Sequence, residues 1–196
     1  MTTACGYRLG AGIAFLTLLA ACSSPSPVLY TIAPVSGPEQ TAAPKVILLQ
    51  QLGLERYLER SQIVRSSENY KLDIMADDWW GEPPGAMLSR VLAAELGQRL
   101  PNSVVINEIG AVSAPADATI ALNVQRMDED ATGAVVLQAQ ASVAFKGRGV
   151  PALRSFRFTV PPTSPGIGGE VAAISIAVGH LADGLVSMLV AGSPGR

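Results

Sequence analysis

One cysteine thiol stands where it can react as a nucleophile in a covalent modification of the chain. Cys22 follows Leu19-Ala20-Ala21, directly after an apolar run that begins behind Arg8. Small residues before the cysteine suit the cleft of a signal peptidase, and the thiol can form a thioether with diacylglycerol. We therefore expect residues 1–21 to be a lipoprotein signal peptide and Cys22 to be the lipidated first residue of the mature chain. An ordinary secretory leader with an accidental cysteine is the alternative.

The apolar run from Leu9 to Leu19 is too short for a membrane-spanning helix, which requires about 20 apolar residues. A lipid on Cys22 would hold the protein on a membrane, because each buried CH₂ contributes about 0.8 kcal/mol. Residues 22–27 are then the lipidated cysteine and a polar, proline-containing spacer of short reach. Ser23, in place of an Asp, resembles the outer-membrane sorting pattern. We expect anchoring at the periplasmic face of the outer membrane.

The other residues that could do chemistry do not form a catalytic or metal-binding set. His180 is the single histidine and the only candidate for the usual general base, and a solvated or capping role is the alternative. One histidine and one acylated cysteine cannot supply the common His/Cys ligands of a metal site. The sequence therefore predicts a protein that is not an enzyme and that has no cofactor and no metal.

Two acidic clusters and one glycine-rich segment are the remaining candidates for binding motifs. Asp77-Asp78 and Asp128-Glu129-Asp130 could hold Ca²⁺ in principle, but neither has the 12-residue ligand spacing with a central glycine, and both are expected to be solvated turns. Residues 166–169 lack the Lys-Ser/Thr of a phosphate-binding loop and are expected to cap a helix.

Trp79 and Trp80 are the one local oddity of the sequence. Two adjacent indoles cannot both face the same core, so we expect one of them to be exposed. Two interpretations are open: one indole closes the edge of the core while the other lies flat on the surface, or the exposed indole contacts a partner protein, as tryptophans often do.

Composition sets the class of protein that must position these residues. Of 196 residues, 48% are hydrophobic and 15% are charged, which is typical of one globular domain, expected over residues 28–191. Without Arg8 of the leader, acidic residues slightly outnumber basic ones, so no nucleic-acid partner is expected. Cys22 is the one cysteine after the leader, and the core must therefore hold by packing alone.

Hydrophobic periodicity predicts two helices and several strands. One helix begins after Pro84 and ends at Pro101; its apolar face comprises Met87, Leu88, Val91, Leu92, Leu96 and Leu100, with Arg90, Glu95, Gln98 and Arg99 elsewhere. The other has a stripe of Val171, Ile174, Val178, Leu181, Leu185 and Met188, with His180 off it. The predicted strands are 28–32, 45–50, 62–65, 70–75, 103–107, 119–127, 134–146 and 155–160.

These elements predict an α+β fold of two layers. Residues 62–65 and 70–75 flank turn-forming residues and are expected to pair as a hairpin, while residues 77–84 interrupt the strands before the first helix. Residues 33–44 are expected to be a loop. A mostly antiparallel β-sheet, with both amphipathic helices packed on one face, buries each apolar stripe.

The mature chain resembles the PqiC-like, or YmbA-like, family of ABC-type transport auxiliary lipoproteins. Three motifs carry the resemblance: Leu29-Tyr30-Thr31 after the spacer, the segment from Tyr57 to Arg65, and Trp80-Gly81-Glu82-Pro83 before the helix with Arg90-Val91-Leu92. The chain departs from the family at Trp79, where a basic residue is usual, at Gly81, where Ala is usual, and at Pro84, where Leu is common.

The resemblance implies a non-enzymatic partner of an MCE-domain (PqiB-like) protein in lipid transport between the two membranes, supporting envelope integrity. Arg60 and Gln62 of the middle motif join Trp79 and Trp80 as candidate contacts to that partner, and homo-oligomerisation is left open. A periplasmic lipid-binding carrier is the second hypothesis, and an envelope hydrolase is the weakest.

Overall fold

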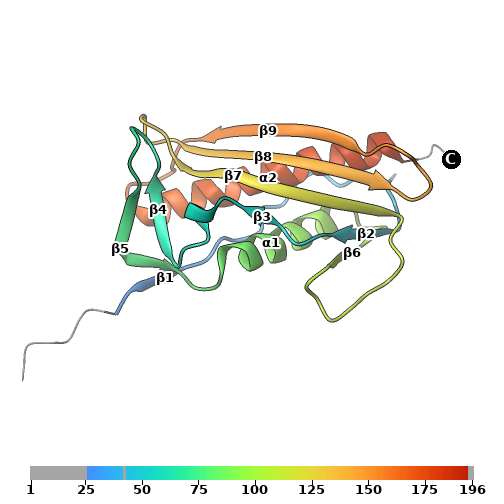
Figure 1. Cartoon of the computed structure of the whole chain (residues 1–196), viewed down its shortest axis with the longest axis horizontal. Helices are drawn as coiled ribbons and strands as arrows, with labels where there is room; N and C mark the ends of the chain where they lie inside the picture. Colours follow the sequence, from blue (N-terminus) through green and yellow to red (C-terminus); the bar gives the residue numbers. More distant parts are fainter. Residues whose placement is uncertain (1–25, 42, 194–196) are drawn as a thin grey trace, which may run out of the picture.

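The computed structural model describes residues 26–41 and 43–193, so Cys22 and the leader predicted over residues 1–21 lie outside the described residues. The described chain forms nine strands, two α-helices and a 3-10 turn (Figure 1). The elements are β1 (Val28–Tyr30), β2 (Val46–Leu49), β3 (Gly53–Leu54), η1 (Arg56–Leu58), β4 (Gln62–Ser66), β5 (Asp73–Trp80), α1 (Pro84–Arg99), β6 (Val104–Asn107), β7 (Ala118–Glu129), β8 (Val135–Phe145), β9 (Ala152–Val160) and α2 (Ile167–Gly192).

β7 organises the sheet because different strands pair with its two edges. Along one edge β8 pairs antiparallel, and β9 pairs antiparallel with β8. Along the other edge β2, β3 and β4 each pair with a different part of β7, and all three run parallel to it. β6 then adds to β2 in parallel, β5 adds to β4 antiparallel, and β1 adds to β5 in parallel.

The fold class α+β is confirmed, but the prediction of a mostly antiparallel sheet is wrong, because the sheet is mixed. Side-chain alternation reports which face of a strand is covered and carries no information about the direction of its neighbour. Parallel neighbours need long connections. The chain supplies them between β2 and β7 and between β4 and β7, where β5, α1 and β6 intervene.

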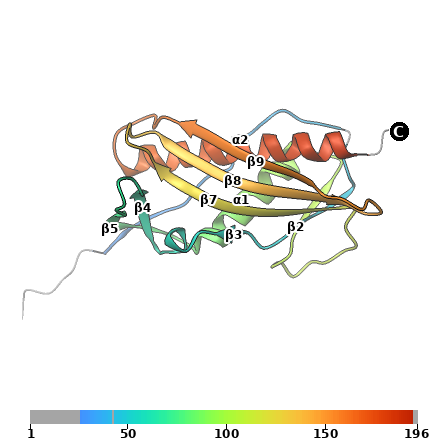
Figure 2. The same ribbon diagram turned by 45° about the horizontal axis from the view of Figure 1, so that its top comes forward.

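Both helices lie on the same side of the sheet, and the views in Figures 1 and 2 agree on this. α2 packs against β7, β8 and β9, and α1 packs against β6 and α2. Every residue of the two predicted apolar stripes is buried. The spacing of those stripes therefore predicted correctly which face of each helix turns toward the core.

α2 is the central element of the core rather than an exposed helix. Its length and composition alone would allow it to cross a membrane, but two thirds of its most apolar window (67%) is buried inside the domain. The helix begins at Gly166, whose φ of 85° is in the left-handed region that favours glycine. The prediction that residues 166–169 form a helix cap is confirmed.

Two local predictions around the acidic clusters are wrong. Residues 77–80 do not interrupt the strands, because β5 continues through Trp80 and gains parallel pairing with β1. Asp128 is not in a solvated turn either. It lies on β7, fully buried, and it accepts hydrogen bonds from the Arg126 guanidinium and the Tyr57 hydroxyl. The hairpin predicted around residues 66–69 is confirmed as β4 and β5.

Candidate functional site

The two tryptophans lie on opposite faces of β5, as alternation along a strand requires. Trp80 is 7% exposed and belongs to the core, and its backbone N–H donates to the Ser61 carbonyl. Trp79 is half-buried on the outer face, where its indole N–H donates to the Ala76 carbonyl at 2.9 Å. The expectation that only one indole faces the core is confirmed, and the one with free ring surface is Trp79.

Three strands place Trp79 between an aliphatic and an amide side chain. In the pairing register Leu29 of β1 lies opposite Trp79, and Gln62 of β4 lies opposite it on the other side. Side chains of paired residues share one face of a sheet. Leu29 is 64% exposed and Gln62 is half-buried. We call Leu29, Trp79 and Gln62 the tryptophan row.

The surroundings of the tryptophan row carry charges of both signs. Arg60 is exposed two residues before Gln62. Asp78 is half-buried on β5, and the Asp78 carboxylate raises the pKa of the nearby Tyr30 hydroxyl. Of the four partner-contact candidates predicted from the sequence, Trp79, Gln62 and Arg60 lie together at the surface, whereas Trp80 lies beneath them. Leu29 was missed, because its pairing with β5 is not visible in the sequence.

A buried arginine joins the two helices to the loop that follows β1. The Arg99 side chain is 1% exposed, and its Nε donates to Asp183 Oδ1 at 2.6 Å. Its terminal nitrogens donate to the carbonyls of Val35, Glu95 and Gly179. The apolar periodicity places Arg99 and Glu95 off the apolar stripe of α1. Both side chains are nevertheless buried, because the loop covers this side of the helix.

The covering loop, residues 33–40, is held by further hydrogen bonds, and we call it the strap. Gln98 bonds both the N–H and the carbonyl of Gly37, and the Gln40 N–H donates to the Arg99 carbonyl. Glu95 accepts the Val35 N–H at 2.8 Å. Burial raises the pKa of the Glu95 carboxyl to about 7, although the Val35 N–H and Arg99 act in the opposite direction. These contacts explain why an otherwise irregular segment has one defined path.

In the described part of the chain, a second buried carboxylate, that of Glu170, lacks hydrogen-bond partners that would offset the cost of its burial. Glu170, in the first turn of α2, is 1% exposed, and neither carboxylate oxygen has a hydrogen-bond partner among residues 26–41 and 43–193. Burial and the neighbouring charge of Glu129 raise the pKa of the Glu170 carboxyl to about 8. A buried carboxylate without partners is costly to the folded state.

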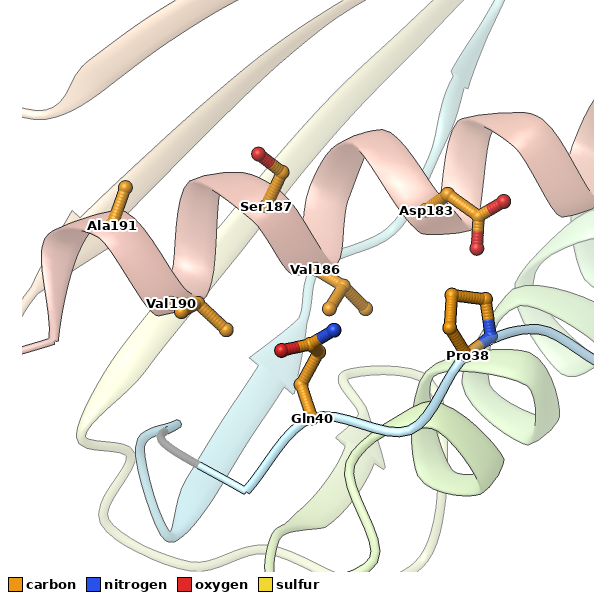
Figure 3. Close-up of a pocket in the computed structure, with 7 residues that line it drawn as sticks. All are labelled: Pro38, Gln40, Asp183, Val186, Ser187, Val190 and Ala191. Carbon is orange, nitrogen blue, oxygen red and sulfur yellow. The ribbon is translucent and has the colours of Figure 1, made fainter.

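Two grooves flank the exposed side of α2. The strap groove, about 350 Å³, lies between the strap and the helix and is shown in Figure 3; it is lined by Pro38, Gln40, Asp183, Val186, Ser187, Val190 and Ala191. The edge groove, about 560 Å³, lies between β9 and α2; it is lined by Arg154, Phe156, Arg157, Phe158, Thr159, His180, Asp183, Gly184 and Ser187.

His180 lies in the edge groove, exposed and off the apolar stripe, as predicted. Its ring packs on Phe158 with the two centroids 5.7 Å apart, and Phe158 in turn stacks on Phe156 at 6.0 Å. His180 therefore extends an aromatic row across the groove. Across the described ranges 26–41 and 43–193, three or more His, Cys, Asp or Glu residues do not gather in a way that could hold a metal ion.

The sequence matches the family of ABC-type transport auxiliary lipoprotein components over residues 28–186, which covers nearly the whole described chain. The chain belongs to this family. The resemblance to the PqiC-like, or YmbA-like, lipoproteins is thereby confirmed. No protein with a curated description matches the sequence.

Solved structures show the same fold at low sequence identity. A protein of Xanthomonas campestris from the family DUF330 is 18% identical; the similarity covers 84% of this chain and 96% of that one, with a TM-score of 0.68. A crystal structure described as an uncharacterized protein is 17% identical and covers 83% of this chain and 98% of that one, with a TM-score of 0.70.

Proposed function

We propose that this chain is a lipoprotein carrying its lipid on Cys22, at the periplasmic face of the outer membrane. In this proposal residues 1–21 are removed, residues 22–27 are the lipidated cysteine and spacer, and residues 28–191 form a single periplasmic domain. The order of leader, small residues and cysteine supports the anchor, and Ser23 supports the outer membrane as its location.

The proposed role is that of a non-enzymatic docking subunit for an MCE-type, ABC-associated system that moves lipid between the membranes. The observation that carries this proposal is the family match over residues 28–186, since the family consists of auxiliary components of ABC-type transport. The structure adds support, because Leu29, two residues after the spacer, pairs with Trp79 and so brings its ring surface close to the start of the domain. A membrane tether and a partly exposed aromatic side chain together suit a docking module.

Crosslinking in cells tests the proposal directly. The full chain would carry a photo-crosslinking amino acid at Arg60, beside the tryptophan row, and the products would be probed for the MCE-domain protein of the same cell. A matched chain would carry the crosslinker at Glu108, an exposed position next to β6. We expect the MCE-domain protein to be captured from Arg60 and not from Glu108.

The same cells separate docking from the two alternatives. Capture of the MCE-domain protein from neither position would contradict the docking proposal. Lipid that copurifies with the chain in a fixed ratio would instead favour a carrier, for which the apolar strap groove is one available surface. Hydrolytic turnover of envelope components that is abolished by loss of His180 would favour the hydrolase.

A further inference from the structure

β9 has an open edge that runs for nine residues. The strand pairs with β8 and, among the described residues, with no other strand. In Figure 1 it is the outermost strand along the top of the sheet. An edge strand presents a row of unpaired backbone N–H and C=O groups, and this row can pair with a strand from another chain.

The hairpin formed by β8 and β9 is positively charged on a protein whose net charge is −2. From residue 131 to residue 169 the sequence contains no Asp or Glu, whereas it contains Lys146, Arg148, Arg154 and Arg157. None of these four cations takes part in a salt bridge within residues 26–41 and 43–193. Their charge is therefore available to an acidic partner.

The edge groove gives this open strand an apolar side. Phe156 and Phe158 point toward α2, and Arg154 lies on the same side with its guanidinium carbon 5.1 Å from the centre of the Phe156 ring. Gly184 allows the close approach, because a Cβ there would come within 2.4 Å of Phe156. On the outer face Arg157 donates to the Gln138 side chain at 3.1 Å.

We propose that the open edge of β9, together with the edge groove, binds an extended acidic segment of a partner protein by strand addition. Alternation fixes the pattern of that segment. Side chains opposite Arg154, Phe156 and Phe158 would face the groove, and the side chain opposite Arg157 would face outward. The favoured segment is acidic opposite Arg154 and Arg157 and apolar opposite Phe156 and Phe158.

A protein segment fits this surface better than an anionic membrane does. The two strand cations lie on opposite faces of β9, so a flat membrane surface could meet only one of them at a time. A paired strand reaches both faces, and its backbone also satisfies the open edge. The inference names a contact for the partner of the proposed docking role and rests on that role.

The test uses the full lipidated chain purified in detergent micelles and two fluorescent peptides. One peptide is Thr-Glu-Thr-Val-Glu-Val-Thr with blocked ends, and the other has the reverse sequence, so that parallel and antiparallel addition are both sampled. We expect one of them to bind and to slow amide hydrogen exchange along β9. Arg154→Glu and Arg157→Glu should each weaken binding about tenfold, because attraction becomes repulsion.

The control is Arg56→Glu, which makes the same change of charge at an exposed position in η1. It should leave peptide affinity unchanged, and thermal unfolding should show that all three variants fold. Binding of neither peptide would overturn the proposal. Binding without protection of the β9 amides, or binding weakened equally by Arg56→Glu, would also overturn it, because either result indicates only non-specific attraction.

Two further measurements complete the test by identifying other occupants. Binding to phosphatidylglycerol vesicles that Arg154→Glu and Arg157→Glu abolish, without peptide binding, would assign the edge to a lipid surface. Self-association that the same variants abolish would assign it to a second copy of this chain. Either result overturns the proposal. Peptide binding in a chain that fails to crosslink to the MCE-domain protein would refute the docking role and leave strand addition standing.

Discussion

The strands β1 and β9 each lie at an open edge of the same sheet, but the two edges have different chemistry. β1 has three residues, two of them exposed aliphatics, and Trp79 lies beside it among charges of both signs. β9 has nine residues and its charged side chains are all cationic. A short edge is protected by its length, whereas a long one needs charge to prevent indiscriminate pairing. Apolar surface therefore dominates near the spacer, and charge with open hydrogen-bonding groups dominates along β9.

The largest expected effect concerns the anchor that precedes β1. Cys22→Ala should leave a folded protein that moves entirely from the membrane fraction to the soluble fraction, because the lipid is the durable attachment. Cell fractionation followed by a high-salt wash measures this. If the variant still sediments with the outer membrane, the protein surface itself binds the membrane. The β1 edge would then not differ from the β9 edge in being held near the membrane by a lipid.

The next effect concerns the core that joins the two edges. Leu181→Asp should destabilise the domain by several kcal/mol, because the substitution buries an unpaired carboxylate on the fully buried side of α2. Typical domains have only about 5 to 15 kcal/mol of stability. Thermal and denaturant unfolding measure the change. The matched control is His180→Asp on the exposed side of the same helix, expected to shift stability by less than about 0.5 kcal/mol.

The adjacent residues Trp79 and Trp80 should have different roles at the β1 edge. Trp80→Ala should lower the free energy of unfolding by about 3 to 5 kcal/mol, because a buried indole is lost. Trp79→Ala should change stability little but weaken binding to the MCE-domain partner by about 2 kcal/mol or more, as at a typical interface hot spot. Melting temperature and partner pull-down separate the two effects. Equal losses of stability and binding at both positions would show that Trp79 stabilises the fold and does not contact the partner.

The smallest effect concerns the buried carboxylate at the start of α2. The Glu170 pKa is raised from its usual 4.5 to about 8 in the folded protein, so its contribution to stability is fully present below about pH 4.5. That contribution is lost as the pH rises toward 8, since the unfolded chain then releases a proton that the folded chain retains.

Glu170→Gln should therefore raise the unfolding free energy at pH 8 by about 1 to 3 kcal/mol and change it little at pH 4. Unfolding curves measured between pH 4 and pH 8 give the dependence of the unfolding free energy on pH. Glu95, whose pKa is raised to about 7, contributes a slope of the same sign in both proteins. A variant with the same pH dependence as the parent would show that Glu170 is solvated or paired in solution.

Local patterns in the sequence determined a large part of the fold. The apolar spacing of Leu88, Leu92 and Leu96, and that of Ile174, Val178 and Leu181, determined which sides of the helices are buried, because a period near 3.6 residues leaves one face apolar. Turn-forming residues at 66–69 determined the hairpin of β4 and β5. The absence of acidic residues from 131 to 169 is equally visible in the sequence and marks the β9 edge as basic.

Only the tertiary structure decided which strands are neighbours and which polar groups are buried. Trp79 has Leu29 and Gln62 beside it because β5 pairs with β1 and β4, and the period of two within β5 cannot specify those partners. Arg99 is buried because Asp183, 84 residues away, and the strap supply its partners. Local periodicity encodes the face that an element turns inward, whereas pairing order and the compensation of buried charge depend on segments far apart in the chain.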